Sequence, residues 1–203
     1  MENNLPENWK KYELGDLLTI QNGYAFPSTD YKKTGVPLIR QSNLAGNKVS
    51  LNKCVFLDKK YIIEKKDFIV TKGDMLIGMS GSIGKLCRYD LEEIGLQNQR
   101  TGKVVLNEKR SNRRFIWHYL NTIERKLQEK GKGLGVSNIS AKDIESLEIL
   151  LPPLDQQELI ADELDSLLLK VSDCQTRLDK IPLILKRFRE SILAAAFLGE
   201  LTR

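Results

Sequence analysis

Cysteine and histidine are scarce in this sequence of 203 residues, and their scarcity excludes several kinds of site. The three cysteines, Cys54, Cys87 and Cys174, lie far apart and form no Cys-x-x-Cys pair, so neither a disulfide framework nor a zinc knuckle is predicted. The one histidine, His118, has no second histidine with which to share a metal ion or form a catalytic dyad. We therefore expect no metal site, and a reducing compartment such as the cytoplasm.

Long apolar stretches are also missing. No apolar run reaches the roughly 18 residues that indicate a transmembrane helix, so no membrane contact is expected. The N-terminal segment MENNLPENWKKYELG is polar and lacks the apolar core of a signal peptide, so we do not expect export. With 41% apolar and 29% charged residues, the composition is that of a folded chain and not of a disordered one.

Catalytic motifs are absent as well. The segment GMSGSIGK is similar to a phosphate-binding loop, but Gly78 precedes Gly84 by one residue too many, and Leu86 replaces the required Ser or Thr. The segment LPPL, at residues 151–154, has two prolines of an adenine methyltransferase tetrad but no amide or carboxylate to hold a base. No glycine-rich cofactor loop or nuclease pattern occurs, so we expect a binding protein and not an enzyme.

Positive charge is unevenly distributed along the chain. Residues 151–203 hold 7 Lys and Arg against 9 Asp and Glu, whereas residues 1–150 hold 25 against 18. The N-terminal part is therefore the basic part, and nucleic acid is the first partner to consider. Many soluble domains are equally basic without binding DNA, so charge alone leaves that alternative open.

The first 110 residues alternate turn signals with short apolar or β-branched runs, a pattern typical of short strands. The runs that we predict as strands are VPLIR (36–40), NKCVFL (52–57), DFIVT (67–71), DMLIGM (74–79) and TGKVVL (101–106). LEILL, at residues 147–151, is predicted as a last strand.

A helix is predicted after NEKRSN, because apolar residues from Phe115 to Leu127 recur at helical spacing. Ser111 or Asn112 can cap its start, and the glycines from Gly131 end it. Ser140 begins a further short helix.

Residues 152–203 follow a different pattern, which we interpret as a long helix. Asp155 and Glu158 predict a capped start, and Pro182 predicts a kink or a division. A helix of roughly 65 Å with a narrow apolar stripe needs a partner helix; packing on its own domain is the alternative. Apolar residues alternate steps of four and three over about five heptads, which is typical of a coiled-coil seam: Ile160, Leu164, Leu167, Val171, Cys174, Leu178, Ile181, Leu185, Phe188, Ile192 and Ala195.

Together these patterns predict an α+β chain. A mostly-β domain over residues 1–151 is followed by a coiled-coil helix over residues 152–203. Apolar residues near the end of the chain, from Ile192 to Leu201 and including Phe197, exceed what one seam needs. We expect them to contact a partner, with a frayed tail as the alternative.

Six segments occur in the following order: LPENWKKYELGDL, VPLIRQSNL, KGDMLIGMSGSIGK, LQNQR, GVSNISAKDIESLEILLPPLDQQELIADELD and IPLILKRFRESILAAAFLGEL. In this order and spacing they resemble the specificity subunit of type I restriction-modification enzymes. The similarity covers nearly the whole chain. Its most specific parts are LPPLDQQELIADELD and RESILAAAFLGEL.

The resemblance implies a target recognition domain that reads one half of a split site in double-stranded DNA. In the usual specificity subunit, two domains and two antiparallel helices share one chain. The helices set the distance between half-sites and dock two modification subunits, which bind S-adenosylmethionine and methylate adenine. No cofactor is thus expected in this chain itself, and restriction subunits are a further partner that the family allows.

This sequence has one domain and one helix, so it resembles a half-length form. Two copies related by a two-fold axis would bury both seams, and their DNA site would be an interrupted palindrome. Three other readings stay open: a protein that titrates modification or full-length specificity subunits without reading DNA, an autonomous dimeric repressor, and an enzyme without a recognisable motif.

Polar residues beside the turns are the predicted DNA contacts, because loops can enter a groove that a sheet cannot. Arg40 and Arg100 are the predicted guanine readers. Structural roles are the alternative: a tight turn for SGSIG, a strand end for residues 97–100 and a core position for Tyr24. The predicted set is Tyr24, Arg40, Gln41, Asn43, Ser80, Ser82, Lys85, Asn98, Gln99, Arg100, Lys132 and Ser137.

Overall fold

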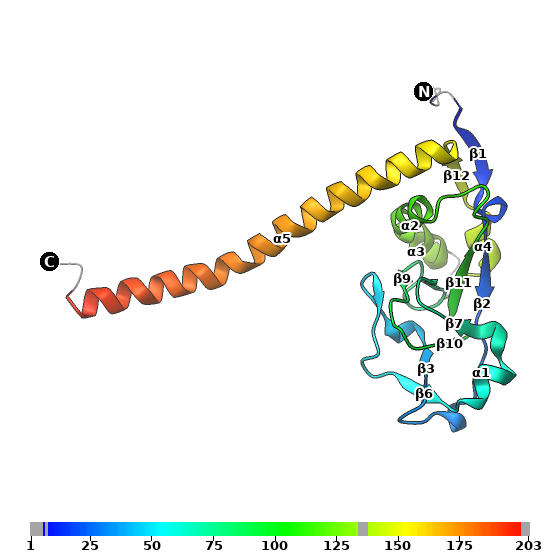
Figure 1. The fold of residues 1–203 in the computed structure, drawn as a ribbon, viewed down its shortest axis with the longest axis horizontal. Helices are drawn as coiled ribbons and strands as arrows, with labels where there is room; N and C mark the ends of the chain where they lie inside the picture. The colour runs from blue at the N-terminus through cyan, green and yellow to red at the C-terminus, as the bar shows by residue number, and fades with distance from the viewer. Residues whose placement is uncertain (1–5, 7, 134–137, 200–203) are drawn as a thin grey trace. The chain divides into compact units, whose positions relative to one another are not determined.

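The structure is a computed structural model that describes residues 6, 8–133 and 138–199 (Figure 1). Of residues 130–133 it describes the backbone only. The chain divides into two compact units, Met1–Glu158 and Leu159–Arg203. The predicted α+β class is confirmed, because the first unit contains mixed sheets with short helices and a long helix follows.

The described residues of the first unit form three sheets together with short helices. Strand β1 (Lys10–Glu13) pairs antiparallel with β12 (Glu148–Leu151), a four-stranded sheet has the order β6-β3-β10-β7, and a six-stranded sheet has the order β2-β11-β8-β9-β5-β4. The remaining strands are β2 (Leu18–Asn22), β3 (Val36–Ile39), β4 (Leu44–Ala45), β5 (Lys48–Val49), β6 (Val55–Leu57), β7 (Ile69–Val70), β8 (Met75–Gly78), β9 (Leu86–Arg88), β10 (Gly95–Gln97) and β11 (Thr101–Leu106).

All six predicted strands are present, and the burial of β3 explains the continuous apolar run that revealed it. Successive side chains of a strand point to opposite faces of a sheet. Leu38 therefore packs with Leu57 and Leu96 in one apolar cluster, while its neighbour Ile39 packs with Leu76 in another. Both faces of this strand are covered, so it has no polar side.

The predicted helix after NEKRSN is two helices, α2 (Arg113–Thr122) and α3 (Glu124–Gly133), separated at Ile123. Asn112, and not Ser111, caps α2, because its side chain accepts hydrogen bonds from the backbone N–H groups of two residues in the first turn. The short helix α4 (Ala141–Glu145) has Ser140 at its start, as predicted. One further helix, α1 (Lys60–Glu64), was not predicted.

Helix α5 (Leu154–Phe197) is one uninterrupted helix that passes through Pro182 (Figure 1), so the division considered there is wrong. The predicted cap at Asp155 is also wrong. The backbone N–H of Gln157 donates to the carbonyl of Pro153 (2.9 Å), so the helical bonds begin at Pro153 and Asp155 lies inside the first turn. No helix of the described residues is long and apolar enough to cross a membrane.

Candidate DNA interface

The turn at residues 97–101, which follows β10, is the centre of the candidate interface. Backbone hydrogen bonds tie it to the turns that follow β3 and β2: the N–H of Asn98 donates to the carbonyl of Ile39 (3.1 Å), and the N–H of Gln99 donates to that of Tyr24 (3.0 Å). Three turns that are far apart in the sequence therefore meet at one place.

Two more turns join on the other side of this centre. The N–H of Met79, after β8, donates to the carbonyl of Arg100 (3.1 Å), and the N–H of Ile139 donates to the carbonyl of Met79 (2.8 Å). Ser80 and Asn138 form an isolated antiparallel bridge beside these bonds. Backbone hydrogen bonds thus join five turns around residues 97–101.

Two hollows flank the turn at residues 97–101. The first, of about 410 Å³, is lined by this turn, by Arg40 and Gln41 after β3, and by aromatic side chains. The second, of about 540 Å³, is lined by the turns after β2 and β8 and by the residues before α4. Gln99 and Arg100 are exposed and line both hollows, so their side chains can reach a ligand bound in either one.

Arg40 is half-buried and its guanidinium is held in place at the first hollow. It lies 5.9 Å from the centroid of the Tyr31 ring, and one terminal nitrogen donates to the carbonyl of Lys53 (3.3 Å). Its Nε is buried without an acceptor among the described residues. A guanidinium that is oriented but not neutralised suits bidentate recognition of a guanine edge or a phosphate.

The amide of Gln41 is positioned by the turn after β8. The hydroxyl of Ser80 donates to its Oε1 (3.2 Å). Gly81 has a φ of +65°, and a Cβ built there would lie 2.4 Å from the Nε2 of Gln41. Only glycine therefore allows this approach without displacing the glutamine.

Asn43 has a different role from the predicted base contact. It is fully buried, its Nδ2 donates to the carbonyl of Ser50 (2.9 Å), and its Oδ1 accepts from the N–H of Arg40 (3.1 Å). Both ends of the amide are used to shape the turn after β3, so it is not available to a base.

The other predicted residues fall into several groups. Asn98 and Ser80 line the hollows but are largely buried. Ser82 and Lys85 follow in the turn after β8 and line neither hollow. The side chain of Lys132 and the whole of Ser137 lie outside what the structure describes.

Tyr24 is half-buried between the rings of Phe26 (centroids 5.0 Å apart) and Phe68 (5.4 Å). The ammonium group of Lys65 lies 4.0 Å from the centroid of the Tyr24 ring. Sequence reasoning missed Lys65, although it belongs to a lysine-rich run, DKKYIIEKK at residues 58–66, that could have pointed to it.

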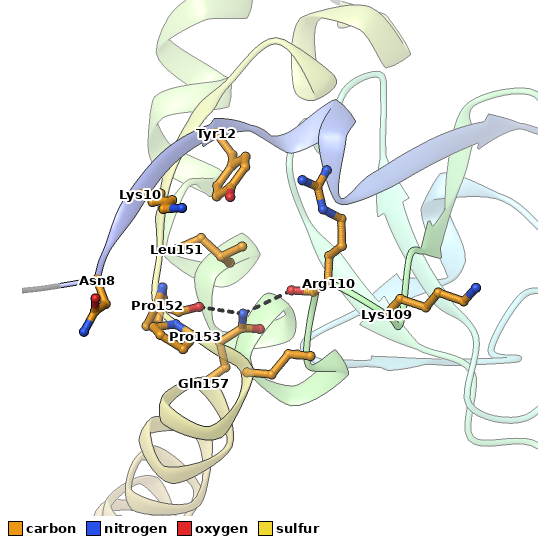
Figure 2. A pocket seen from close by; sticks show the side chains of 10 residues that line it. Asn8, Lys10, Tyr12, Lys109, Arg110, Leu151, Pro152, Pro153 and Gln157 are labelled. Atoms are coloured by element: carbon orange, nitrogen blue, oxygen red, sulfur yellow. Dashed lines mark hydrogen bonds between the residues drawn. The ribbon is translucent and has the colours of Figure 1, made fainter.

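A second feature that sequence reasoning missed lies where the first unit ends (Figure 2). Gln157, in the first turn of α5, is only 1% exposed. Its Nε2 donates to the carbonyls of Pro152 (2.9 Å) and Arg110 (3.2 Å), and its Oε1 accepts from the N–H of Asn112 (2.7 Å). Gln157, the second glutamine of LPPLDQQ, thus joins the start of the helix to the loop before α2.

The pKa shifts of the described residues have local physical causes. Burial raises the pKa of the Cys87 thiol to about 11, and the hydrogen bond from Lys32 lowers the pKa of the Asp58 carboxyl. Among the described residues, no group of three or more His, Cys, Asp or Glu is placed to hold a metal ion.

Comparison with known proteins gives consistent matches. Residues 6–182 match the family described as Type I restriction modification DNA specificity domain. The chain is 33% identical over 199 residues to the type I restriction enzyme EcoBI specificity subunit of Escherichia coli, covering 97% of this chain and 40% of that protein. It is 30% identical over 208 residues to the EcoKI specificity subunit of Escherichia coli strain K12, covering 98% and 44%.

Solved structures agree on the fold. The crystal structure of the HsdS subunit from Thermoanaerobacter tengcongensis matches with a TM-score of 0.73 at 22% identity, covering 98% of this chain and 47% of that one. A chain from a study of complex assembly and conformational transition of the type I R-M system matches with a TM-score of 0.77 at 22% identity, covering 97% and 47%. The chain therefore spans less than half the length of these relatives.

Proposed function

Because the chain belongs to the family of type I restriction modification DNA specificity domains, we propose that it reads one half-site of an interrupted DNA target. The observation that carries this proposal is the convergence of five turns around Gln99 and Arg100. Arginine pairs with guanine and glutamine with adenine in the major groove, so Arg40, Gln41, Gln99 and Arg100 suit base recognition. We propose that the chain acts in the cytoplasm and is not itself a catalyst.

The second part of the proposal is that two copies associate through antiparallel α5 helices. From Leu167 to Leu185, the apolar seam residues of α5 are at least 43% exposed in the single chain. From Ile160 to Ile192 the seam is symmetric about residue 176, close to the middle of the helix. With a two-fold axis at that height, each of these ten seam residues faces a seam residue of the other copy: 160 faces 192, 164 faces 188, 167 faces 185, 171 faces 181 and 174 faces 178.

This register can be tested with the native cysteine of the seam. In the antiparallel pair Cys174 faces Leu178 of the other copy, whereas in a parallel pair Cys174 would face Cys174. Oxidation of Leu178→Cys should then give a covalent dimer on a non-reducing gel, and oxidation of the unmodified chain should not. Adding Cys174→Ala to the variant should abolish the cross-link. Cross-linking of the unmodified chain through Cys174 would exclude the antiparallel arrangement.

The third part concerns partners that supply catalysis. Apolar side chains of α5 outside the seam are also exposed, among them Leu169, Leu183 and Phe197, the last at 90%. We propose that they dock modification subunits, which would bind S-adenosylmethionine and methylate adenine, and that restriction subunits can join the same complex. Exposed apolar surface of this kind marks an interaction site.

A base-resolution methylome of cells that express the chain with its modification subunit tests the proposed function. An interrupted palindrome with methyladenine on both strands is the expected result. A bipartite site with two different halves would mean that the chain pairs with another specificity chain. Absence of new methylation, although the complex forms, would overturn half-site reading and favour a protein that titrates modification subunits.

A further inference from the structure

A hollow of about 420 Å³ lies where β1, β12 and the start of α5 meet, and we call it the junction hollow (Figure 2). Lys10 and Tyr12 of β1 and Lys109 and Arg110 of the loop after β11 line its polar side, or rim; the guanidinium of Arg110 points toward Tyr12, whereas the Lys109 side chain extends outward (Figure 2). Its floor is apolar and is formed by residues 151–154. All these residues belong to the first unit.

Within the part of the chain that the structure describes, the rim cations have no acidic partner. No carboxylate lines the hollow, and among the described residues none forms an ion pair with Lys10, Lys109 or Arg110. The guanidinium of Arg110 lies 5.3 Å from the centroid of the Tyr12 ring, so an aromatic face holds it without neutralising it. The rim is therefore suited to an anionic group.

Two acidic residues beside the rim, Glu108 and Glu148, are already paired with other cations. Glu108 pairs with Arg113 (2.9 Å), and Glu148 pairs with Lys11 (2.6 Å). An anion that enters the hollow would thus meet the rim cations without displacing an existing ion pair.

The floor is apolar and its polar atoms are satisfied. Leu154, in the first turn of α5 and next to two prolines, is an apolar residue that is 44% exposed. The buried amide of Gln157 uses both of its ends within the protein, including the bond to the carbonyl of Pro152. A ligand would therefore gain by covering the floor with an apolar group and would find no free polar atom there.

We propose that the junction hollow receives an acidic segment of a partner protein, with an apolar side chain on the floor and a carboxylate at the rim. This inference rests on the proposed function, in which modification subunits dock on the chain. A DNA phosphate would satisfy the rim but leave Leu154 and the prolines uncovered. The hollow also shares no residue with the two hollows of the DNA interface. Within the first unit, β1 and β12 lie at the opposite end from β3 and β6 (Figure 1).

The test is the double charge reversal Lys109→Glu with Arg110→Glu in the full chain. Its affinity for the modification subunit, measured by calorimetry at 50 and 300 mM salt, should fall by about tenfold or more at low salt and lose part of its salt dependence. The matched control is Lys59→Glu with Lys60→Glu, an exposed pair at α1 with the same change of charge, which should leave that affinity unchanged.

A second probe does not depend on the modification subunit: a fluorescent peptide of alternating glutamate and leucine. The unmodified chain and the α1 control should bind it, and the reversed hollow should not. Peptide binding without modification-subunit binding would refute the docking part of the proposed function and leave the hollow supported. Modification-subunit affinity that is equal in both double variants, or loss of DNA affinity alone in the reversed hollow, would overturn the inference. The inference would also be overturned if the unmodified chain bound neither the modification subunit nor the peptide.

Discussion

Replacing Gln157 with alanine should lower the free energy of unfolding of the first unit by about 3 kcal/mol. The substitution removes the partner of three buried or half-buried backbone groups, the carbonyls of Pro152 and Arg110 and the N–H of Asn112. A buried polar group left unpaired costs about 1–3 kcal/mol. A water molecule that fills the space of the lost amide would recover part of the total, so we expect a loss at the lower end of the sum for the three groups.

Urea denaturation followed by tryptophan fluorescence measures this effect. Both tryptophans, Trp9 and Trp117, lie in the first unit, so the signal reports that unit and not the rest of α5. The expected loss corresponds to a fall in melting temperature of about 6–12 °C for a unit of this size. Gln157→Leu, which keeps much of the volume without the polar atoms, should be destabilised as well.

Gln156→Ala is the matched control, because the neighbouring glutamine makes one side-chain bond, accepted from the indole N–H of Trp9 at 3.2 Å. It should cost about 0.5–1.5 kcal/mol, the net value of a single hydrogen bond. Equal losses for Gln156→Ala and Gln157→Ala, or a loss below about 1 kcal/mol for Gln157→Ala, would refute the reasoning from buried backbone groups.

Three further predictions concern the DNA interface and the core. Arg100→Ala or Arg40→Ala should cost about 1–3 kcal/mol of DNA affinity and relax specificity at one base position, measured by fluorescence anisotropy on variant sites; a loss that is uniform across sequences would indicate a phosphate contact instead. Gly81→Ala should weaken DNA binding without unfolding the chain, because its Cβ would displace the Gln41 amide; unchanged affinity would remove Gln41 from the interface. Burial raises the pKa of Cys87 from its ordinary value of 9.0 to about 11. The unfolded thiol therefore ionises first, and the contribution of Cys87 to the free energy of unfolding should be constant below pH 9 and fall towards pH 11. Urea titrations of Cys87→Ala should show a shallower fall; an identical pH profile would contradict the assignment.

The fold was predictable from the sequence where burial leaves a local pattern. The strand at Val36–Ile39 is apolar throughout because two clusters cover its faces, and the composition alone reveals it. Strand β10 was not predicted, since its three residues are held by parallel pairing with β3 and antiparallel pairing with β7, which are distant in the sequence. The break between α2 and α3 at Ile123 was likewise not predicted, because the apolar residues keep their helical spacing across it.

The candidate site was predictable in its parts but not in its arrangement. Gly23 marked a turn, and the structure shows why it is glycine: a Cβ there would lie 2.2 Å from the carbonyl oxygen of Asn98. Which turns meet is decided by such long-range approaches, which spacing does not encode. Asn43 shows a second limit of prediction from sequence. Its side chain shapes the turn after β3, but the flanking residues do not distinguish that role from contact with a base.

The pairing of β1 with β12 has a consequence for how such chains can change. Lys10 lies opposite Leu151 and Glu13 opposite Glu148, so the chain enters and leaves the rest of the first unit at adjacent points. A segment with neighbouring ends can be replaced as a block without moving what lies outside it. Recombination between related genes at these two strands would exchange the whole candidate DNA interface and leave α5 unchanged. The DNA target could then change by exchange of this one segment, while the proposed contacts of α5 with partner chains stayed the same.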